Sequence, residues 1–287
     1  MRSHHHRVTG SFVSGDQQIC YRLYENHYAA GARRLVLLHG AGVAGVDTWE
    51  HMLPFLKGWR WLLVPDLRGM GATTALDGVE RRFSVEEVAE DVLELLDHLQ
   101  WHPCDLAGYS FGGLVALLMK AAQPHRFEKQ YLLESALLDR AAQSEVVRLR
   151  ERYSLAAQLM RDSAQPEQGI RLFLDTIAPN RIPSPRAEAL TIARLARRPL
   201  GFAYALDAVT DASRRIERGE LLDLQGDVSS LIGGRSVEPM HHFQRQLAEL
   251  LPAWHYHPIA GCDHSLPFQK PRQIGQLMSA ELLRFLA

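Results

Sequence analysis

The stretch Gly108-Tyr109-Ser110-Phe111-Gly112 has the form G-x-S-x-G and lies between an apolar, strand-like pair, Leu106-Ala107, and a helix-like segment at 113–119. Glycines two positions before and after the serine let a strand reverse sharply into a helix and hold the hydroxyl on a strained, exposed turn. The alternative is an ordinary glycine-rich turn. Because a serine becomes a nucleophile only when geometry and a base activate it, the rest of the chain decides between the two.

The segments around this turn alternate between strand-like and helix-like patterns. Unbroken apolar runs at 35–38 and 61–64 predict strands buried on both faces of a parallel sheet. Ser84 and Glu87 have the spacing of a capping box, and the apolar spacing after them predicts a helix to Leu99. Further strands are expected at 12–13 and 19–24 as a hairpin, and at 131–133, 228–232 and 254–258, with a last helix from about residue 273. This alternation predicts an α/β fold with a mostly parallel sheet flanked by helices.

The alternation breaks between about residues 137 and 225, where no strand is expected. Four helices are predicted there, at 143–161, 166–177, 185–196 and 201–218, with prolines between them. We interpret the dense arginines and glutamates of the first helix as a solvated face. The prediction is a helical lid at 137–225, inserted into a core formed by residues 1–136 and 226–287.

Composition and charge narrow the function classes. The 287 residues suffice for one large α/β domain with an insertion, and the net charge of −1 indicates neither a nucleic-acid partner nor an acidic membrane surface. No apolar run reaches the roughly 18 residues of a membrane span, and the first residues lack the apolar core of a secretory signal. The three cysteines have no paired spacing. We expect a cytoplasmic protein that acts on a small molecule without a metal or cofactor, and the sequence leaves assembly into a homodimer open.

Three further motifs each follow a predicted strand. They are His39-Gly40-Ala41-Gly42, Asp66-Leu67-Arg68-Gly69-Met70-Gly71 and Gly261-Cys262-Asp263-His264-Ser265-Leu266-Pro267. Together with the serine turn they follow the order of the HG motif, the D-x-R-G-x-G turn, the nucleophile elbow and the histidine loop of the α/β-hydrolase superfamily. The chain resembles this superfamily nearly from end to end. The resemblance implies an α/β-hydrolase fold with an inserted all-helical cap, in the serine-nucleophile, esterase-like branch.

The resemblance also implies roles for single residues. Ser110 is expected to attack an acyl carbon, and His264 to take its proton and deliver it to the leaving group. The backbone N–H groups of Ala41 and Phe111 are expected to form the oxyanion hole. His39 is interpreted as a residue that orders its loop by hydrogen bonding.

The acid of this expected triad is missing from its usual place. Most family members carry an Asp in a G-x-x-D pattern after the strand before the last one, where this chain ends the pattern with Ser236. Two replacements are open: Glu238, two residues further on, and Glu134, which ends the apolar run at 131–133. Some haloalkane dehalogenases of the superfamily carry a Glu at the position that corresponds to Glu134. The position is also physically reasonable, because strand ends on one edge of a parallel sheet open into the same crevice. We predict Glu134, with Glu238 as the alternative acid and another acid or a Ser–His dyad as the remaining options.

The serine at the elbow narrows the reaction. Epoxide hydrolases and dehalogenases of the superfamily need a carboxylate there, because they form an ester with the enzyme. We predict a carboxylic-ester hydrolase that forms an acyl-enzyme with small to medium, apolar acyl groups. Some lid residues should line its pocket, from the set Leu155, Met160, Leu172, Phe173, Ile177, Leu190, Phe202 and Tyr204. The alternatives are a C–C bond hydrolase of the meta-cleavage type, a lactonase and, supported only by Ser236, a non-catalytic binding protein.

Overall fold

The central element of the chain is a sheet whose strands are mostly parallel. The computed structural model describes residues 5–162 and 164–287. The expectation that the chain has no secretory signal rests partly on residues 1–4, which lie outside the described residues. Within the described residues, nine strands form one sheet in the order β1-β2-β4-β3-β6-β7-β8-β9, with β5 (Thr74–Ala75) paired to β2. β1 (His5–Ser14) and β2 (Gln17–Asn26) pair antiparallel with each other, and β2 pairs antiparallel with β4. The other six strands pair in parallel, each with its neighbour in the sheet: β4 (Trp61–Pro65), β3 (Arg34–Leu38), β6 (Cys104–Tyr109), β7 (Phe127–Leu133), β8 (Asp227–Gly233) and β9 (Trp254–Ile259). The predicted fold class is confirmed.

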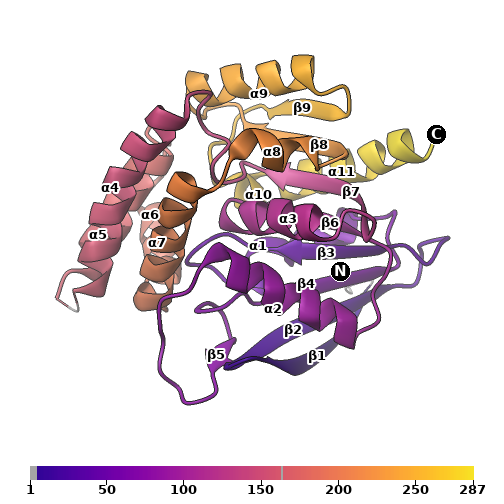
Figure 1. Cartoon of the computed structure of the whole chain (residues 1–287), viewed down its shortest axis with the longest axis horizontal. Helices are drawn as coiled ribbons and strands as arrows, with labels where there is room; N and C mark the ends of the chain where they lie inside the picture. The colour runs from indigo at the N-terminus through magenta and orange to yellow at the C-terminus, as the bar shows by residue number, and fades with distance from the viewer. Residues whose placement is uncertain (1–4, 163) are drawn as a thin grey trace.

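Helices cover both faces of the sheet (Figure 1). One face packs against α2 (Val85–His98), α3 (Phe111–Ala122), α8 (Arg218–Asp223) and α9 (Glu238–Leu250). The other packs against α1 (Gly45–Trp49), the short helix η1 (Leu53–Phe55), α10 (Leu266–Gln269) and α11 (Pro271–Leu286). Successive side chains of a strand point to opposite faces, so Val36 and Leu38 join the first core and Leu35 and Leu37 the second. This two-sided burial explains why the four buried residues of β3, at 35–38, are all apolar.

The predicted capping box is present at the start of α2. The Glu87 N–H donates to Ser84 Oγ at 3.1 Å, and the Ser84 N–H donates to Glu87 Oε2 at 2.7 Å. These bonds satisfy two of the backbone donors that a helix start leaves without an intrahelical partner. Among the described residues, no helix is both long and apolar enough to cross a membrane.

Four helices stand together beside the sheet, at the left of Figure 1. They are α4 (Gln143–Arg161), α5 (Pro166–Ile177), α6 (Pro185–Leu195) and α7 (Pro199–Arg215), close to the predicted ranges. The described residues between 137 and 225 contain no strand, as expected. α8, which the predicted boundary assigns to the lid, instead places Leu221 and Leu222 in the core cluster shared with α3. The division into core and lid stays a prediction, and we use "lid helices" for α4–α7.

Candidate active site

The serine turn joins the end of β6 to the start of α3. Ser110 has φ 52° and ψ −112°, a backbone conformation that a residue with a side chain rarely adopts. The neighbouring strand holds it there, because the Ser110 N–H donates to the Leu133 carbonyl at 2.9 Å and the Ala136 N–H donates to the Ser110 carbonyl at 2.9 Å. The strain therefore is balanced by hydrogen bonds on both sides of the turn.

The two glycines of the G-x-S-x-G motif are required by close packing. A Cβ atom at Gly108 would overlap the carbonyl oxygen of Gly112, and one at Gly112 would lie 2.5 Å from the carbonyl oxygens of Leu38 and His39. Real Cβ atoms do not approach backbone oxygens this closely. The turn thus needs glycine at both positions for space, and their φ angles are not positive.

Three side chains from distant parts of the sequence form one hydrogen-bonded chain. His264 Nε2 lies 3.2 Å from Ser110 Oγ, and His264 Nδ1 lies 2.7 Å from Glu134 Oε2. Ser110 follows β6, Glu134 follows β7 and His264 lies in the loop after β9, so all three stand at the carboxyl ends of parallel strands. When Nδ1–H donates to the carboxylate, Nε2 is left free to accept the serine proton.

The second carboxylate oxygen of Glu134 is held as firmly as the first. Oε1 accepts a hydrogen bond from the Gly233 N–H at 2.7 Å and from the Ser236 hydroxyl at 2.5 Å. Ser236 occupies the position at which the resemblance leads one to expect an Asp. Its hydroxyl donates a hydrogen bond to Glu134, the acid predicted to take the place of that Asp. This role was missed in the sequence, where Ser236 counted only as a lost charge.

Glu238, the alternative acid, does not reach the site. It begins α9 with 75% of its side chain exposed and forms an ion pair with Arg245. That pair lowers the pKa of Glu238. No hydrogen bond or ion pair joins it to His264 within the described chain, so the geometry brings only one of the two proposed acids to the histidine.

The loop that carries His264 is ordered by Asp263. The Asp263 carboxylate accepts hydrogen bonds from the Ser265 N–H at 2.9 Å and from the Gln269 side chain at 3.0 Å. Gln269 in turn accepts from the Asp263 N–H at 3.0 Å. Asp263 therefore acts on the site through the loop backbone, because its carboxylate is occupied by these donors.

Two backbone N–H groups near Ser110 have no acceptor within the part of the chain that the structure describes. Among the described residues, the N–H groups of Ala41 and Phe111 donate no hydrogen bond, and both residues line the same cavity as Ser110. Phe111 is the first residue of α3, where N–H groups lack an intrahelical partner and the helix dipole favours negative charge. This arrangement suits an oxyanion.

Residues 35–276 match the sequence profile of the alpha/beta hydrolase family. The chain belongs to this family. A dihydrolipoyllysine-residue acetyltransferase component of the acetoin cleaving system of Pseudomonas putida is 28% identical over 256 residues, covering 88% of this chain and 64% of that protein. A 2-hydroxy-6-oxo-2,4-heptadienoate hydrolase of Pseudomonas putida is 31% identical over 109 residues, covering 37% of this chain and 39% of that protein. This chain thus spans less than two thirds of the length of either relative.

The solved structure of a thermophilic esterase from Thermogutta terrifontis has the same fold. Its TM-score is 0.72 at 20% identity, over 98% of this chain and 99% of the esterase. At that identity the likeness concerns the fold alone.

His39 links two loops beside the site. Its Nε2 accepts a hydrogen bond from the Leu67 N–H at 2.8 Å, and its Nδ1 lies 2.8 Å from the Gly40 carbonyl, to which it donates. These two bonds require the neutral ring with its proton on Nδ1. Burial lowers the pKa of His39, in agreement with a neutral ring that orders the loops.

The stability of the protein should fall as the pH drops below about 6.5 because of His39. The unfolded ring titrates near 6.5, whereas burial holds its folded pKa lower, so between these values the unfolded state binds a proton that the folded state excludes. The contribution is at most about 1.4 kcal/mol per pH unit. Urea denaturation at several pH values should show that the free energy of unfolding depends less on pH in His39→Gln than in the wild type. Equal slopes would assign the acid sensitivity to other groups.

Two small cavities meet at Ser110 and His264. One, of about 70 Å³, has mostly apolar walls, with Arg194 and Thr191 as its polar lid residues; its apolar lining includes Phe173, Leu174, Ile177, Leu195 and Phe268. The other, of about 40 Å³, is more polar and is lined by Glu134, Asp139, Arg150 and Tyr153, among others. Ser110 therefore lines both cavities, and the second has more charged side chains in its wall than the first.

The expected lid lining is confirmed for only part of the set. Phe173 and Ile177 line both cavities. Leu155 and Leu190 are instead 50% and 60% exposed, so they belong to the members of the set that do not line the pocket. Met160 and Phe202 are buried in the core of the lid helices themselves. Helical spacing identifies apolar faces, but it does not say which of them faces Ser110.

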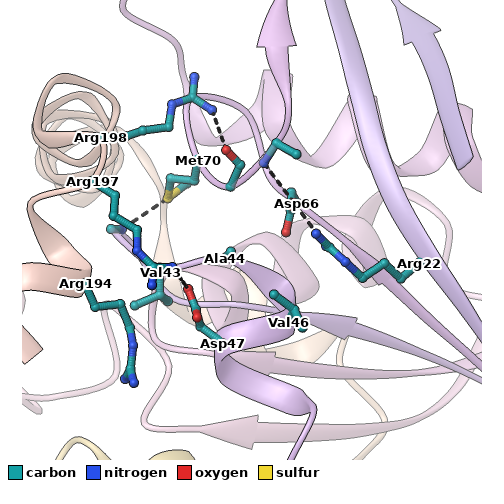
Figure 2. Close-up of a pocket in the computed structure, with 13 residues that line it drawn as sticks. Arg22, Val43, Ala44, Val46, Asp47, Asp66, Met70, Arg194, Arg197 and Arg198 are labelled. Atoms are coloured by element: carbon teal, nitrogen blue, oxygen red, sulfur yellow. Dashed lines mark hydrogen bonds and ion pairs between the residues drawn. The ribbon is translucent and has the colours of Figure 1, made fainter. Parts of the chain in front are cut away.

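A third cavity, of about 240 Å³, lies beside the site and is rich in arginine (Figure 2). Three of its guanidinium groups already have carboxylate partners: Arg22 with Asp66, Arg197 with Asp47 and Arg198 with Glu80. The fourth, Arg194, also lines the apolar cavity, and its guanidinium lies 4.9 Å from the centre of the Phe268 ring. None of the residues of the hydrogen-bonded chain lines this third cavity. In the described part of the chain, no group of three or more His, Cys, Asp or Glu residues is arranged to hold a metal ion.

Proposed function

We propose that this hydrolase cleaves carboxylic esters through an acyl-enzyme formed on Ser110. The observation that carries the proposal is the continuous chain from Ser110 Oγ through His264 to Glu134, with distances of 3.2 Å and 2.7 Å. A serine is activated when a base lies within reach of its hydroxyl and a third group orients that base. The free N–H groups of Ala41 and Phe111 add donors for the oxyanion.

The proposed reaction has two steps. Ser110 Oγ forms a bond to the ester carbonyl carbon while His264 Nε2 takes its proton, and the bond to the alcohol oxygen breaks as His264 returns that proton to the alcohol. Water then attacks the acyl-enzyme, His264 again serves as base, and the bond to Ser110 Oγ breaks to release the acid. Each oxyanion donor contributes about 3–4 kcal/mol of transition-state stabilisation in enzymes of this kind.

The size of the apolar cavity supports small to medium acyl groups. It holds about 70 Å³ and is lined mainly by aliphatic and aromatic side chains. A C–C bond hydrolase is the second candidate, favoured by the similarity to the 2-hydroxy-6-oxo-2,4-heptadienoate hydrolase of Pseudomonas putida. A lactonase would use the same serine chemistry on a cyclic ester.

Two assays test the proposal. The protein should hydrolyse p-nitrophenyl acetate and butyrate, and a fluorophosphonate should label Ser110, as peptide mass spectrometry would show. Loss of a dienoate's absorbance without turnover of either ester would favour the C–C hydrolase. The absence of both turnover and labelling would contradict serine hydrolysis and would favour the alternative of a non-catalytic binding protein.

A further inference from the structure

One charged side chain of the lid helices lies inside the catalytic region. Arg150 of α4 lines the 40 Å³ cavity together with Ser110 and His264, and only 7% of the residue is exposed. The interpretation of this helix's charges as a solvated face is therefore wrong for Arg150. It holds for Arg148 and Arg152 on the same helix, which are exposed.

Within the described residues, the guanidinium of Arg150 donates hydrogen bonds to neutral partners alone. Nε donates to Thr210 Oγ1 at 3.1 Å and Nη2 donates to the Leu206 carbonyl at 2.7 Å, whereas Nη1 donates to no described residue. No carboxylate oxygen of the described chain forms an ion pair with Arg150 within the 4.0 Å limit. Burial lowers the pKa of Arg150 to about 10, so it remains charged at neutral pH. A buried cation without a counter-ion costs several kcal/mol of folding free energy, which points to a ligand as its partner.

Tyr153 offers a second donor in the same cavity. It lies one helical turn beyond Arg150, is 2% exposed, and its ring centre is 4.3 Å from the Arg150 guanidinium. Its hydroxyl makes no hydrogen bond within the described chain, and Tyr153 lines the same cavity as Arg150. Burial raises the pKa of Tyr153, so the hydroxyl keeps its proton and can donate.

The acidic groups of this cavity do not supply the missing acceptor. Both oxygens of Glu134 are taken by His264, Gly233 and Ser236. Burial lowers the pKa of Arg150 and the charges of Asp139 and Asp207 act against this, but neither carboxylate lies within 4.0 Å of its guanidinium. Two donors, one of them charged, therefore face a cavity that reaches the nucleophile.

We propose that Arg150 and Tyr153 bind a carboxylate of the substrate, so that the ester carries this carboxylate on either its acyl or its alcohol half. The inference rests on the proposed ester hydrolysis and names its substrate class: half-esters of dicarboxylic acids or esters of hydroxy acids. Arginine suits this task because its planar N–H groups match the two oxygens of a carboxylate. The apolar cavity then takes the other half of the ester.

Two matched pairs of esters test the inference, one for each half. Monomethyl glutarate is compared with methyl 5-methylhexanoate, and 4-acetoxybutyrate with 4-methylpentyl acetate; within each pair an isopropyl group replaces the carboxylate. Proton release at constant pH gives kcat/KM for all four. The wild type should prefer the anionic member of at least one pair, and Arg150→Met should lower that preference by about 10- to 100-fold, the worth of a hydrogen bond to a charged group.

Matched variants separate recognition from folding. Arg150→Lys keeps the charge and should retain part of the preference, whereas Arg148→Met removes an exposed charge from the same helix and should retain all of it. Tyr153→Phe should lower the preference by roughly tenfold, and it provides the comparison if Arg150→Met does not fold. Glutarate should also slow fluorophosphonate labelling of the wild type more than of either cavity variant, which gives a readout independent of turnover.

The two proposals fail in different ways. If the wild type hydrolyses the esters without preferring a carboxylate, or if Arg150→Met and Tyr153→Phe keep the preference, the carboxylate subsite is overturned and ester hydrolysis stands. If none of the four esters is hydrolysed and Ser110 is not labelled, ester hydrolysis itself is contradicted, and the inference falls with it.

Discussion

Ser110→Ala should reduce ester hydrolysis by about six orders of magnitude and abolish fluorophosphonate labelling, while the protein stays folded. Ser110 Oγ is the only side-chain oxygen in hydrogen-bond contact with His264 Nε2 within the described chain, so its removal leaves the base with nothing to activate. The elbow itself is held by backbone bonds to Leu133 and Ala136, which alanine preserves. The melting temperature should therefore change little. Steady-state kinetics and thermal denaturation measure the two effects.

The matched control for this variant is Ser144→Ala. Ser144 is exposed near the start of α4, away from both cavities, and its loss should alter neither kcat nor labelling. Hydrolysis that survives in Ser110→Ala at more than a trace would mean that another group attacks the ester, and the assignment of the nucleophile would be withdrawn.

Glu134→Gln should lower kcat by about 10⁴-fold with little change in KM, as removal of the orienting acid does in Ser-His-Asp enzymes. Glu134 Oε2 faces His264 Nδ1, and Oε1 faces the Gly233 N–H, so both donors require an oxygen. An amide has only one oxygen. Glutamine must either turn its NH₂ toward His264, which selects the wrong tautomer, or leave the buried Gly233 N–H without an acceptor. Kinetics with p-nitrophenyl butyrate would measure the loss.

Glu238→Gln is the control that separates the two acids. Glu238 is exposed and paired with Arg245, so its variant should keep wild-type kcat. Because the Ser236 hydroxyl contacts Glu134, adding Ser236→Asp to Glu134→Gln should return part of the lost activity by restoring a carboxylate beside the histidine. Full activity in Glu134→Gln with collapse in Glu238→Gln would reverse the assignment.

Much of the fold was predictable because its signals are local. Apolar runs bounded by glycines and prolines predicted the parallel strands, and the lid helices at 143–161 and 166–177 were predicted to the residue. The capping box at Ser84 is likewise a pattern within four residues. Such signals can be recognised in the sequence, because strand and helix periodicities depend on residues that are neighbours along the chain. α8 was missed because it is short and its packing on α3 is not encoded in its own spacing.

Single charged residues were harder to interpret. Arg150 lies on a helix with many charges, and sequence spacing gives no reason to separate it from Arg148 or Arg152. Its burial follows from the packing of α4 against Thr210 and Leu206 of α7, which lie about 60 residues away along the chain.

The sequence by itself indicated most of the strands, the four lid helices, the glycine-flanked elbow at Ser110 and the histidine loop, because each is a pattern of neighbouring residues. Only the tertiary structure decided which carboxylate reaches His264. The partners of Glu134 lie 99, 102 and 130 residues away in the chain, and β7, β8 and β9 bring them together as consecutive parallel strands of the sheet. A hydrogen bond across that separation leaves no local pattern, because it is made by strand order in the sheet rather than by spacing along the chain.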